Sequence, residues 1–141
     1  MKKRKIAVYT GNRAEYGLQL PILDAISKHP LLEYNLIVSG AHLEKKYGQT
    51  INEIRSDGYE VSHQIKLDLR TDDLKNTPDA IGRGISSISA ALNKIKPDFC
   101  LVYGDRFETF SAAIASSQSG IPTVHFEGGD ITEGGALDDS V

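Results

Sequence analysis

Two hydrophobic periodicities alternate along this chain, and their alternation restricts the possible folds more than any single motif does. Short apolar runs are typical of strands buried on both faces, and longer segments with apolar residues every three or four positions are typical of helices. The runs that predict strands are 5–10, 34–38, 60–65, 99–103 and 123–126. The segments that predict helices are 16–28, 47–57, 78–96 and 107–117. Strands and helices in this order predict an α/β protein with a Rossmann-like, doubly wound parallel sheet.

Local signals refine the predicted element boundaries. Pro21 fits a helix only in its first turn, so the first helix is expected to begin within a few residues of that proline. Thr77 is a suitable N-cap, Pro78 suits the first helical position, and Pro97 ends that helix. Residues 66–76 are polar and predict a long loop, which is either a functional lid or a plain solvated connection.

Composition narrows the class of protein. A length of 141 residues suits one domain, over residues 1–141. The net charge of −3 argues against nucleic acid as a partner, and no segment has the roughly 18 apolar residues that would span a membrane. The lone Cys100 forms no internal disulfide, and the basic first residues precede too short an apolar run for a signal peptide. We therefore expect a cytoplasmic protein.

Residues that directly follow the strands are the candidates for a ligand site, because ligands of such sheets bind beyond the carboxyl ends of the strands. With the usual strand order 3-2-1-4-5, the first strand neighbours the fourth and the fourth neighbours the fifth. Arg13, Asp105 and Glu127 should then share one crevice. The candidates are Gly11, Asn12, Arg13, Glu15, Ser39, Gly40, His42, Gly104, Asp105, Arg106, Glu127, Gly128, Gly129 and Asp130.

The first of these loops suits a phosphate but not a nicotinamide dinucleotide. Gly11 allows a ligand to approach the backbone, helix N-terminal amides attract anions, and Arg13 can clamp a phosphate. The loop lacks the G-x-G-x-x-G spacing, and no acidic residue ends the second strand to hold a ribose. These absences argue against a nicotinamide-dependent dehydrogenase, and the lack of a Walker sequence excludes a P-loop kinase. We expect no cofactor.

Asp105 and Glu127 are the candidates for proton transfer. Two carboxylates at adjacent strand ends repel each other and lose water, which should raise the pKa of at least one and provide an acid and a base. Alternatively, Asp105 pairs with Arg106 or caps the following helix. His42 could reach the crevice or be solvated. His125 and Glu127 could bind a metal, but no third ligand has a recognisable spacing, so we expect no metal site.

Three stretches in register resemble one family. They are Thr10-Gly11-Asn12-Arg13-Ala14-Glu15-Tyr16-Gly17, then Gly104-Asp105-Arg106 with Glu108, then His125-Phe126-Glu127-Gly128-Gly129-Asp130 continuing to Leu137-Asp138-Asp139-Ser140. The family is the hydrolysing UDP-N-acetylglucosamine 2-epimerases of sialic-acid and legionaminic-acid biosynthesis. The resemblance covers the whole chain. It implies the N-terminal half of a two-domain, glycosyltransferase-B-like fold, with the substrate between the two lobes.

The resemblance also implies an activity and its residues. UDP would leave by elimination across C1 and C2, and water would add to the glycal to give N-acetylmannosamine. Asp105, Glu127 and Asp138 match the family's catalytic carboxylates, with Asp139 as the alternative to Asp138. Arg13 matches the residue near the phosphates, and Gly11, His42, Arg106, Gly128, Gly129 and Asp139 are the other expected substrate-binding residues.

The resemblance further implies a second lobe with most of the uridine pocket and a catalytic histidine. We therefore expect the 141-residue chain alone to be inactive, because transition-state binding would be divided between the lobes. The longer protein is expected to form a dimer or tetramer. Alternatives are a non-hydrolysing UDP-N-acetylglucosamine 2-epimerase, the N-terminal lobe of a glycosyltransferase, and a nucleotide-sugar binding module.

Overall fold

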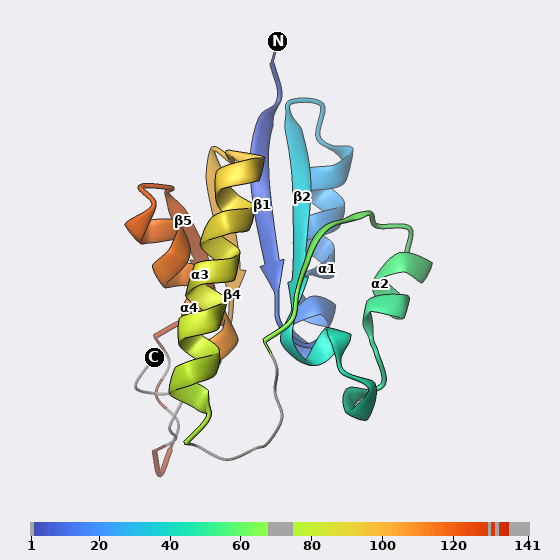
Figure 1. Ribbon diagram of the computed structural model, residues 1–141. Coiled ribbons are helices and arrows are strands. Elements are labelled where there is room, and N and C mark those ends of the chain that lie inside the picture. Colours follow the sequence, from blue (N-terminus) through green and yellow to red (C-terminus); the bar gives the residue numbers. More distant parts are fainter. Residues whose placement is uncertain (1, 68–74, 130, 132, 136–141) are drawn as a thin grey trace.

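Five parallel strands form one sheet at the centre of the molecule (Figure 1). The computed structural model describes residues 2–67, 75–129, 131 and 133–135. Within them, the order β3-β2-β1-β4-β5 confirms the predicted arrangement, and every neighbouring pair is parallel. The strands are β1 Arg4–Thr10, β2 Leu32–Ser39, β3 Val61–Ile65, β4 Phe99–Tyr103 and β5 Thr123–Phe126.

Helices cover both faces of the sheet, as the doubly wound prediction requires (Figure 1). The helices are α1 Arg13–Lys28, α2 Ile51–Ser56, α3 Thr77–Ile95 and α4 Phe107–Gln118. Side chains of α1 and α2 pack in one hydrophobic cluster, and side chains of α3 and α4 pack in the other. The predicted fold class is therefore confirmed.

Strand β1 supplies both halves of the core, because successive side chains of a strand point to opposite faces. Ala7 and Tyr9 belong to the cluster under α3 and α4, whereas Val8 belongs to the cluster under α1 and α2. All three are buried. This alternation places the strand's carboxyl end, where the candidate site begins, between two packed layers.

Three predicted helix boundaries were wrong. Helix α1 begins at Arg13, so Pro21 lies in its interior; the Asn12 side chain caps the helix by accepting a hydrogen bond from Glu15 N. An interior proline removes one hydrogen bond, and the packing of α1 against the sheet compensates for that loss. The second predicted helix is divided, because Lys45–Tyr47 form a separate 3₁₀ turn that ends at Gly48 in the left-handed conformation. Helix α3 begins at Thr77, one residue earlier than predicted.

Two other predictions, on membrane-spanning segments and on a long loop, can be compared only with the described residues. Among its helices, none is both long enough and apolar enough to cross a membrane. Most of the loop predicted over residues 66–76 lies outside the described residues. Leu67, at its start, is buried against α3 in the hydrophobic core.

Candidate active site

Hydrogen bonds join α1, α4 and strands β4 and β5 at the carboxyl edge of the sheet. The Thr109 hydroxyl, in α4, donates to Glu15 Oε1 at 3.2 Å and to the Tyr103 carbonyl oxygen at 3.0 Å. His125, in β5, is hydrogen-bonded through Nε2 to the Gly104 carbonyl oxygen at 2.6 Å. Residues of α1, α4, β4 and β5 therefore meet at one edge of the sheet. The cleft that Arg13 lines contains neither Asp105 nor Glu127.

The first loop is fixed by a modified capping box. Glu15 N donates to Asn12 Oδ1 at 3.0 Å, which satisfies one of the free amides at the start of α1. The Glu15 side chain reaches back and accepts from Gly11 N at 3.1 Å, one residue before the N-cap. In the loop that was expected to hold a phosphate, the Gly11 amide is therefore already hydrogen-bonded to a carboxyl group.

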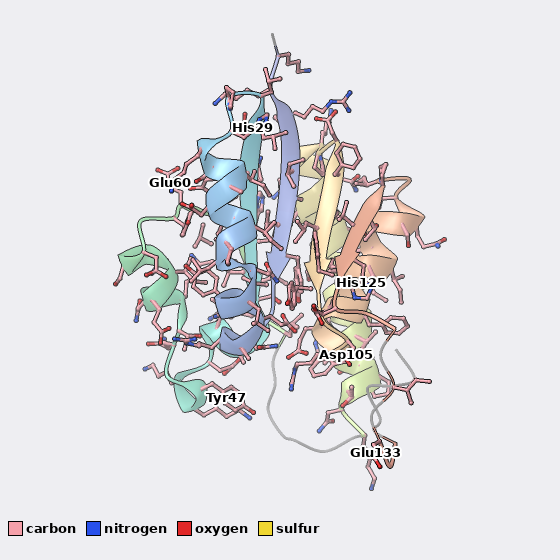
Figure 2. All side chains as sticks on the ribbon, turned by 180° about the vertical axis from the view of Figure 1, so that it is seen from behind. His29, Tyr47, Glu60, Asp105, His125 and Glu133 are labelled. Atoms are coloured by element: carbon pink, nitrogen blue, oxygen red, sulfur yellow. The ribbon has the colours of Figure 1, made fainter. Side chains whose placement is uncertain are left out.

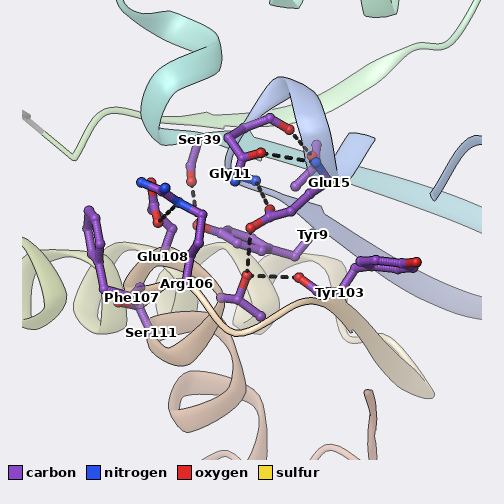
Figure 3. Close-up of polar contacts among 12 residues, drawn as sticks. Tyr9, Gly11, Glu15, Ser39, Tyr103, Arg106, Phe107, Glu108 and Ser111 are labelled. Carbon is purple, nitrogen blue, oxygen red and sulfur yellow. Dashed lines mark hydrogen bonds and ion pairs between the residues drawn. The ribbon is translucent and has the colours of Figure 1, made fainter. Parts of the chain in front are cut away.

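Glu15 is a buried acid. It is 6% exposed, and its burial, together with the nearby negative charge of Glu108, raises its pKa to about 7. The hydrogen bonds from Gly11 and Thr109 and the charge of Arg106 oppose that rise but do not cancel it. Figure 3 shows Glu15 between the first loop and the start of α4. Near neutral pH this group is able to hold or release a proton.

Glu108 forms the second part of the same buried cluster. Its side chain is fully buried and accepts from Arg106 Nε at 3.2 Å (Figure 3). Backbone from two other loops packs against it so closely that side chains do not fit. A Cβ on Gly11 would lie 2.9 Å from Glu108 Cβ, and a Cβ on Gly40 would lie 2.8 Å from the Gly11 carbonyl oxygen. Glycine is needed at both positions for this close approach.

His42 lies beneath the loops after β1 and β2. It is 0% exposed, so the expectation that it could be solvated was wrong. Its ring joins two hydroxyl groups: Nε2 is 2.9 Å from Thr10 Oγ1 and Nδ1 is 2.8 Å from Thr50 Oγ1. Burial lowers the pKa of His42 to about 4, and the positive charge of Arg13 acts in the same direction. A neutral ring in this position ties the first loop to the start of α2.

Arg13 lies on the side of the site that faces α2. Its Nε donates to Glu53 Oε2 at 2.9 Å, and the two side chains are 61% and 49% exposed. Both line a surface cleft of about 420 Å³ with Tyr16, Asn52 and Asp57. The guanidinium is thus accessible beside the N-terminus of α1, and an exposed ion pair of this kind contributes little to stability and can be exchanged for a ligand.

Asp105 and Glu127 follow adjacent strands, β4 and β5. Asp105 is half-buried and Glu127 is exposed, whereas two other acids at this edge of the sheet, Glu15 and Glu108, are buried. Arg106, the alternative partner proposed for Asp105, pairs with Glu108, and the Asp105 side chain is not the N-cap of α4. Figure 2 shows Asp105 and His125 at one end of the sheet and His29 and Glu60 toward the other.

The backbone after β5 has an unusual conformation. Glu127 has φ +54°, in the left-handed region that non-glycine residues rarely adopt, and Gly129 has φ +88°. Residues held in such conformations concentrate at functional sites. Gly128 and Gly129, two of the three glycines predicted to bind substrate, lie in this turn. Asp138 and Asp139, the other predicted acidic residues, lie outside the described residues, as does Asp130.

The sequence placed Glu15 among the candidates for a ligand site without assigning it a role, and it assigned Glu108 none beyond its place in the family-like stretch. The spacing Asn12-x-x-Glu15 signals a capping box, and an acid in the first turn of α4 signals an ordinary helix start. Both signals favour exposed structural roles, whereas the fold buries both carboxyls in one cluster. Within the described residues, no group of three or more His, Cys, Asp and Glu side chains is arranged to hold a metal ion.

Comparison with known proteins identifies the family. A family described as UDP-N-acetylglucosamine 2-epimerase matches residues 24–141, most of the chain. The chain belongs to the UDP-N-acetylglucosamine 2-epimerase family. The stretches after β4 and β5, on which the resemblance partly rested, lie within the matched residues.

Curated relatives match the chain along nearly its whole length. It is 35% identical over 138 residues to a hydrolysing UDP-N,N'-diacetylbacillosamine 2-epimerase of Legionella pneumophila, covering 98% of this chain and 36% of the relative. It is 33% identical to a UDP-N-acetylglucosamine 2-epimerase of Neisseria meningitidis serogroup B, covering 98% of this chain and 35% of the relative. The chain thus spans about a third of the length of these epimerases.

Solved structures agree on the fold. A UDP-GlcNAc 2-epimerase from Neisseria meningitidis bound to UDP-GlcNAc superposes with a TM-score of 0.74 at 23% identity, covering 92% of this chain and 33% of the other. An epimerase from Methanocaldococcus jannaschii, in complex with UDP-GlcNAc and UDP, gives a TM-score of 0.70 at 21% identity, covering 86% of this chain and 32% of the other. The family's sheet and its surrounding helices are reproduced in this chain.

Proposed function

We propose that this chain provides the N-terminal lobe of a hydrolysing UDP-N-acetylglucosamine 2-epimerase, which converts UDP-N-acetylglucosamine and water into N-acetylmannosamine and UDP. The observation that carries the proposal is that Asp105 and Glu127 follow the adjacent parallel strands β4 and β5, and that Arg13 begins the helix after β1, the neighbour of β4. The family match supports the epimerase, and the Legionella pneumophila relative, whose name specifies a hydrolysing 2-epimerase, supports the hydrolysing reaction.

The residues divide the proposed chemistry between proton transfer and anion binding. One carboxylate, Asp105 or Glu127, removes the proton at C2 of the sugar, and the pair of electrons released forms the C1–C2 double bond as the C1–O bond to UDP breaks. Arg13 and the amides at the start of α1 stabilise the negative charge on the departing phosphate. Water then adds across the double bond: hydroxide to C1, and a proton from the second acid to C2.

The accessible Arg13 guanidinium supports its part in this scheme. Its partner Glu53 is about half exposed, so exchange of a carboxylate for a phosphate costs little desolvation. We include Asp138 or Asp139 as a third proton-transfer group on the resemblance of residues 137–140 to the family. The second lobe, the oligomeric state and the cytoplasmic location follow from the resemblance and the composition, and they stay predictions.

The test is ¹H and ³¹P NMR with UDP-N-acetylglucosamine in D₂O. The 141-residue chain is compared with a chimaera in which it replaces the matching part of the Legionella pneumophila relative, and a second chimaera uses the Neisseria meningitidis serogroup B relative. We expect the chimaeras to release UDP and a free sugar that carries deuterium at C2, and the chain alone to be inactive. Cooperative thermal unfolding verifies that each chimaera is folded.

Two outcomes would contradict this expectation. A UDP-sugar product with deuterium at C2, without free sugar, would identify the non-hydrolysing reaction. A folded chimaera that turns over neither UDP-N-acetylglucosamine nor UDP-N,N'-diacetylbacillosamine would refute the epimerase proposal and favour a glycosyltransferase lobe or a binding module. Asp105→Asn and Glu127→Gln should each lower turnover at least about 100-fold. Glu60→Gln, an exposed acid toward the other end of the sheet (Figure 2), is the matched control.

A further inference from the structure

His125 connects the two loops that carry Asp105 and Glu127. Its Nε2 lies 2.6 Å from the carbonyl oxygen of Gly104, the residue directly before Asp105. That carbonyl belongs to the peptide group that joins Gly104 to Asp105, so the hydrogen bond fixes the orientation of the peptide plane that precedes Asp105. His125 lies on β5, and Glu127 follows two residues later, directly after the end of that strand.

The hydrogen bond from His125 restrains Gly104, a residue with unusual conformational freedom. Gly104 has φ +79° and no side chain, so on its own it leaves the chain after β4 free to rotate. Strand β5 holds it from both sides: Gly104 N donates to the Phe126 carbonyl oxygen at 2.8 Å, and the Gly104 carbonyl accepts from His125. The rings of Tyr103 and Phe126 stack at 6.4 Å between centroids beside these bonds.

The other side of the His125 ring is occupied by the turn after Glu127. A Cβ built on Gly128 would overlap His125 Cε1 and lie 2.5 Å from both ring nitrogens. The Gly128 backbone therefore lies directly on the imidazole, and only glycine fits there without moving the ring. One imidazole thus contacts the backbone next to both carboxylates.

We propose that His125 is a positioning residue that holds Asp105 and Glu127 at a fixed separation, through its hydrogen bond to the Gly104 carbonyl and its contact with Gly128. The inference rests on the proposed function, because Asp105 and Glu127 are proton-transfer groups only in that reaction. Proton transfer at a sugar carbon requires both groups within hydrogen-bonding reach of their targets, and misplacement by about 1 Å can cost about 100-fold in rate.

The test is a double-mutant cycle in an active chimaera, with kcat and KM measured separately. His125→Ala should lower kcat about 10- to 100-fold and change KM less than about threefold, because alignment of the reacting groups is lost rather than binding. His125→Gln, whose amide N–H can replace the Nε2 donor, should recover part of kcat. Val124→Ala, at an exposed position next to it on β5, is the matched control and should stay within about twofold of the unchanged protein.

Gly128→Ala gives the decisive arm of the cycle. Alone it should lower kcat, because the added methyl displaces the His125 ring. In the His125→Ala background it should have little further effect, because the ring is already absent. Additive losses, or an unchanged kcat in His125→Ala, would overturn the inference.

A second measurement separates this inference from the proposed function. In ¹⁵N-labelled 141-residue chain, His125→Ala should shift the amide signals of Asp105 and Glu127, and His125→Gln should restore them toward their original positions. Amide shifts that stay unchanged would refute the positioning role even if the chimaera is active. Shifts that change as expected, in a protein that turns over no UDP-sugar, would instead refute the proposed function.

Discussion

The free energy of unfolding of this chain should fall as the pH rises because Glu15 is buried, and Glu15→Gln should remove that fall. Burial raises the pKa of Glu15 from 4.5 to about 7 in the folded state. Below about pH 4.5 the group is protonated in both states and carries no penalty. As the pH rises from 4.5 through about 7, the unfolded chain releases this proton before the folded chain does, so the free energy of unfolding falls and then levels off.

The size of the effect follows from that pKa difference. At 1.36 kcal/mol per pKa unit, the rise from 4.5 to about 7 corresponds to about 3 kcal/mol. Glutamine keeps an oxygen that accepts from Gly11 N and carries no charge at any pH. Thr109, which also donates to the Tyr103 carbonyl, can accept from the new amide. Glu15→Gln should thus be nearly neutral at pH 4.5 and more stable than the unchanged chain by about 3 kcal/mol at pH 8.

Urea unfolding followed by circular dichroism at pH 4.5 and pH 8 measures this difference. Glu33→Gln, at an exposed acid of β2, is the control: it keeps Glu15 and should lose stability between pH 4.5 and pH 8 as the unchanged chain does. Other titrating groups, His42 among them, act alike in both proteins and cancel in the comparison. A Glu15→Gln protein that is destabilised equally at both pH values would refute the reasoning, because Glu15 would then be stabilising as an ordinary ionised cap.

Three further predictions concern buried groups elsewhere. Burial lowers the pKa of His42 from 6.5 to about 4, so the unfolded chain takes up a proton before the folded chain does as the pH falls through this range. The free energy of unfolding should fall by about 3 kcal/mol as a result. His42→Asn should abolish this loss at acid pH in the same urea assay. The Cys100 thiol, fully buried and with its pKa raised to about 11, should react with a thiol reagent at pH 8 only after unfolding, and fast reaction of folded protein would contradict its burial. Gly84→Ala should destabilise the chain by about 1–3 kcal/mol, because its methyl would lie 2.9 Å from Ser111 Oγ on α4, whereas Gly82→Ala, on the open side of α3, should be neutral or stabilising in thermal unfolding.

The order of strands and helices could be predicted from sequence because it depends on neighbouring residues. An apolar run of five residues or a repeat of three and four is visible in the chain itself, and the handedness of crossovers then leaves few sheet topologies. The predicted strand order places Asp105 and Glu127 after neighbouring strands, and the observed order of β4 and β5 confirms this. The predicted start of α1 was wrong because Asn12 caps the helix before Arg13 and the helix contains Pro21 in its interior.

Burial of polar groups could not be predicted in the same way. Glu15 and Glu108 are far apart in sequence and look like ordinary helix-start acids, yet packing of α4 against the first loop removes both from water. His42 gave no sign of its two hydroxyl partners, and His125 gave none of its bond to Gly104. Local patterns determine which elements form, because they act within a few residues. Solvent exposure and pKa are decided by contacts between distant segments, and only the assembled tertiary structure makes those contacts.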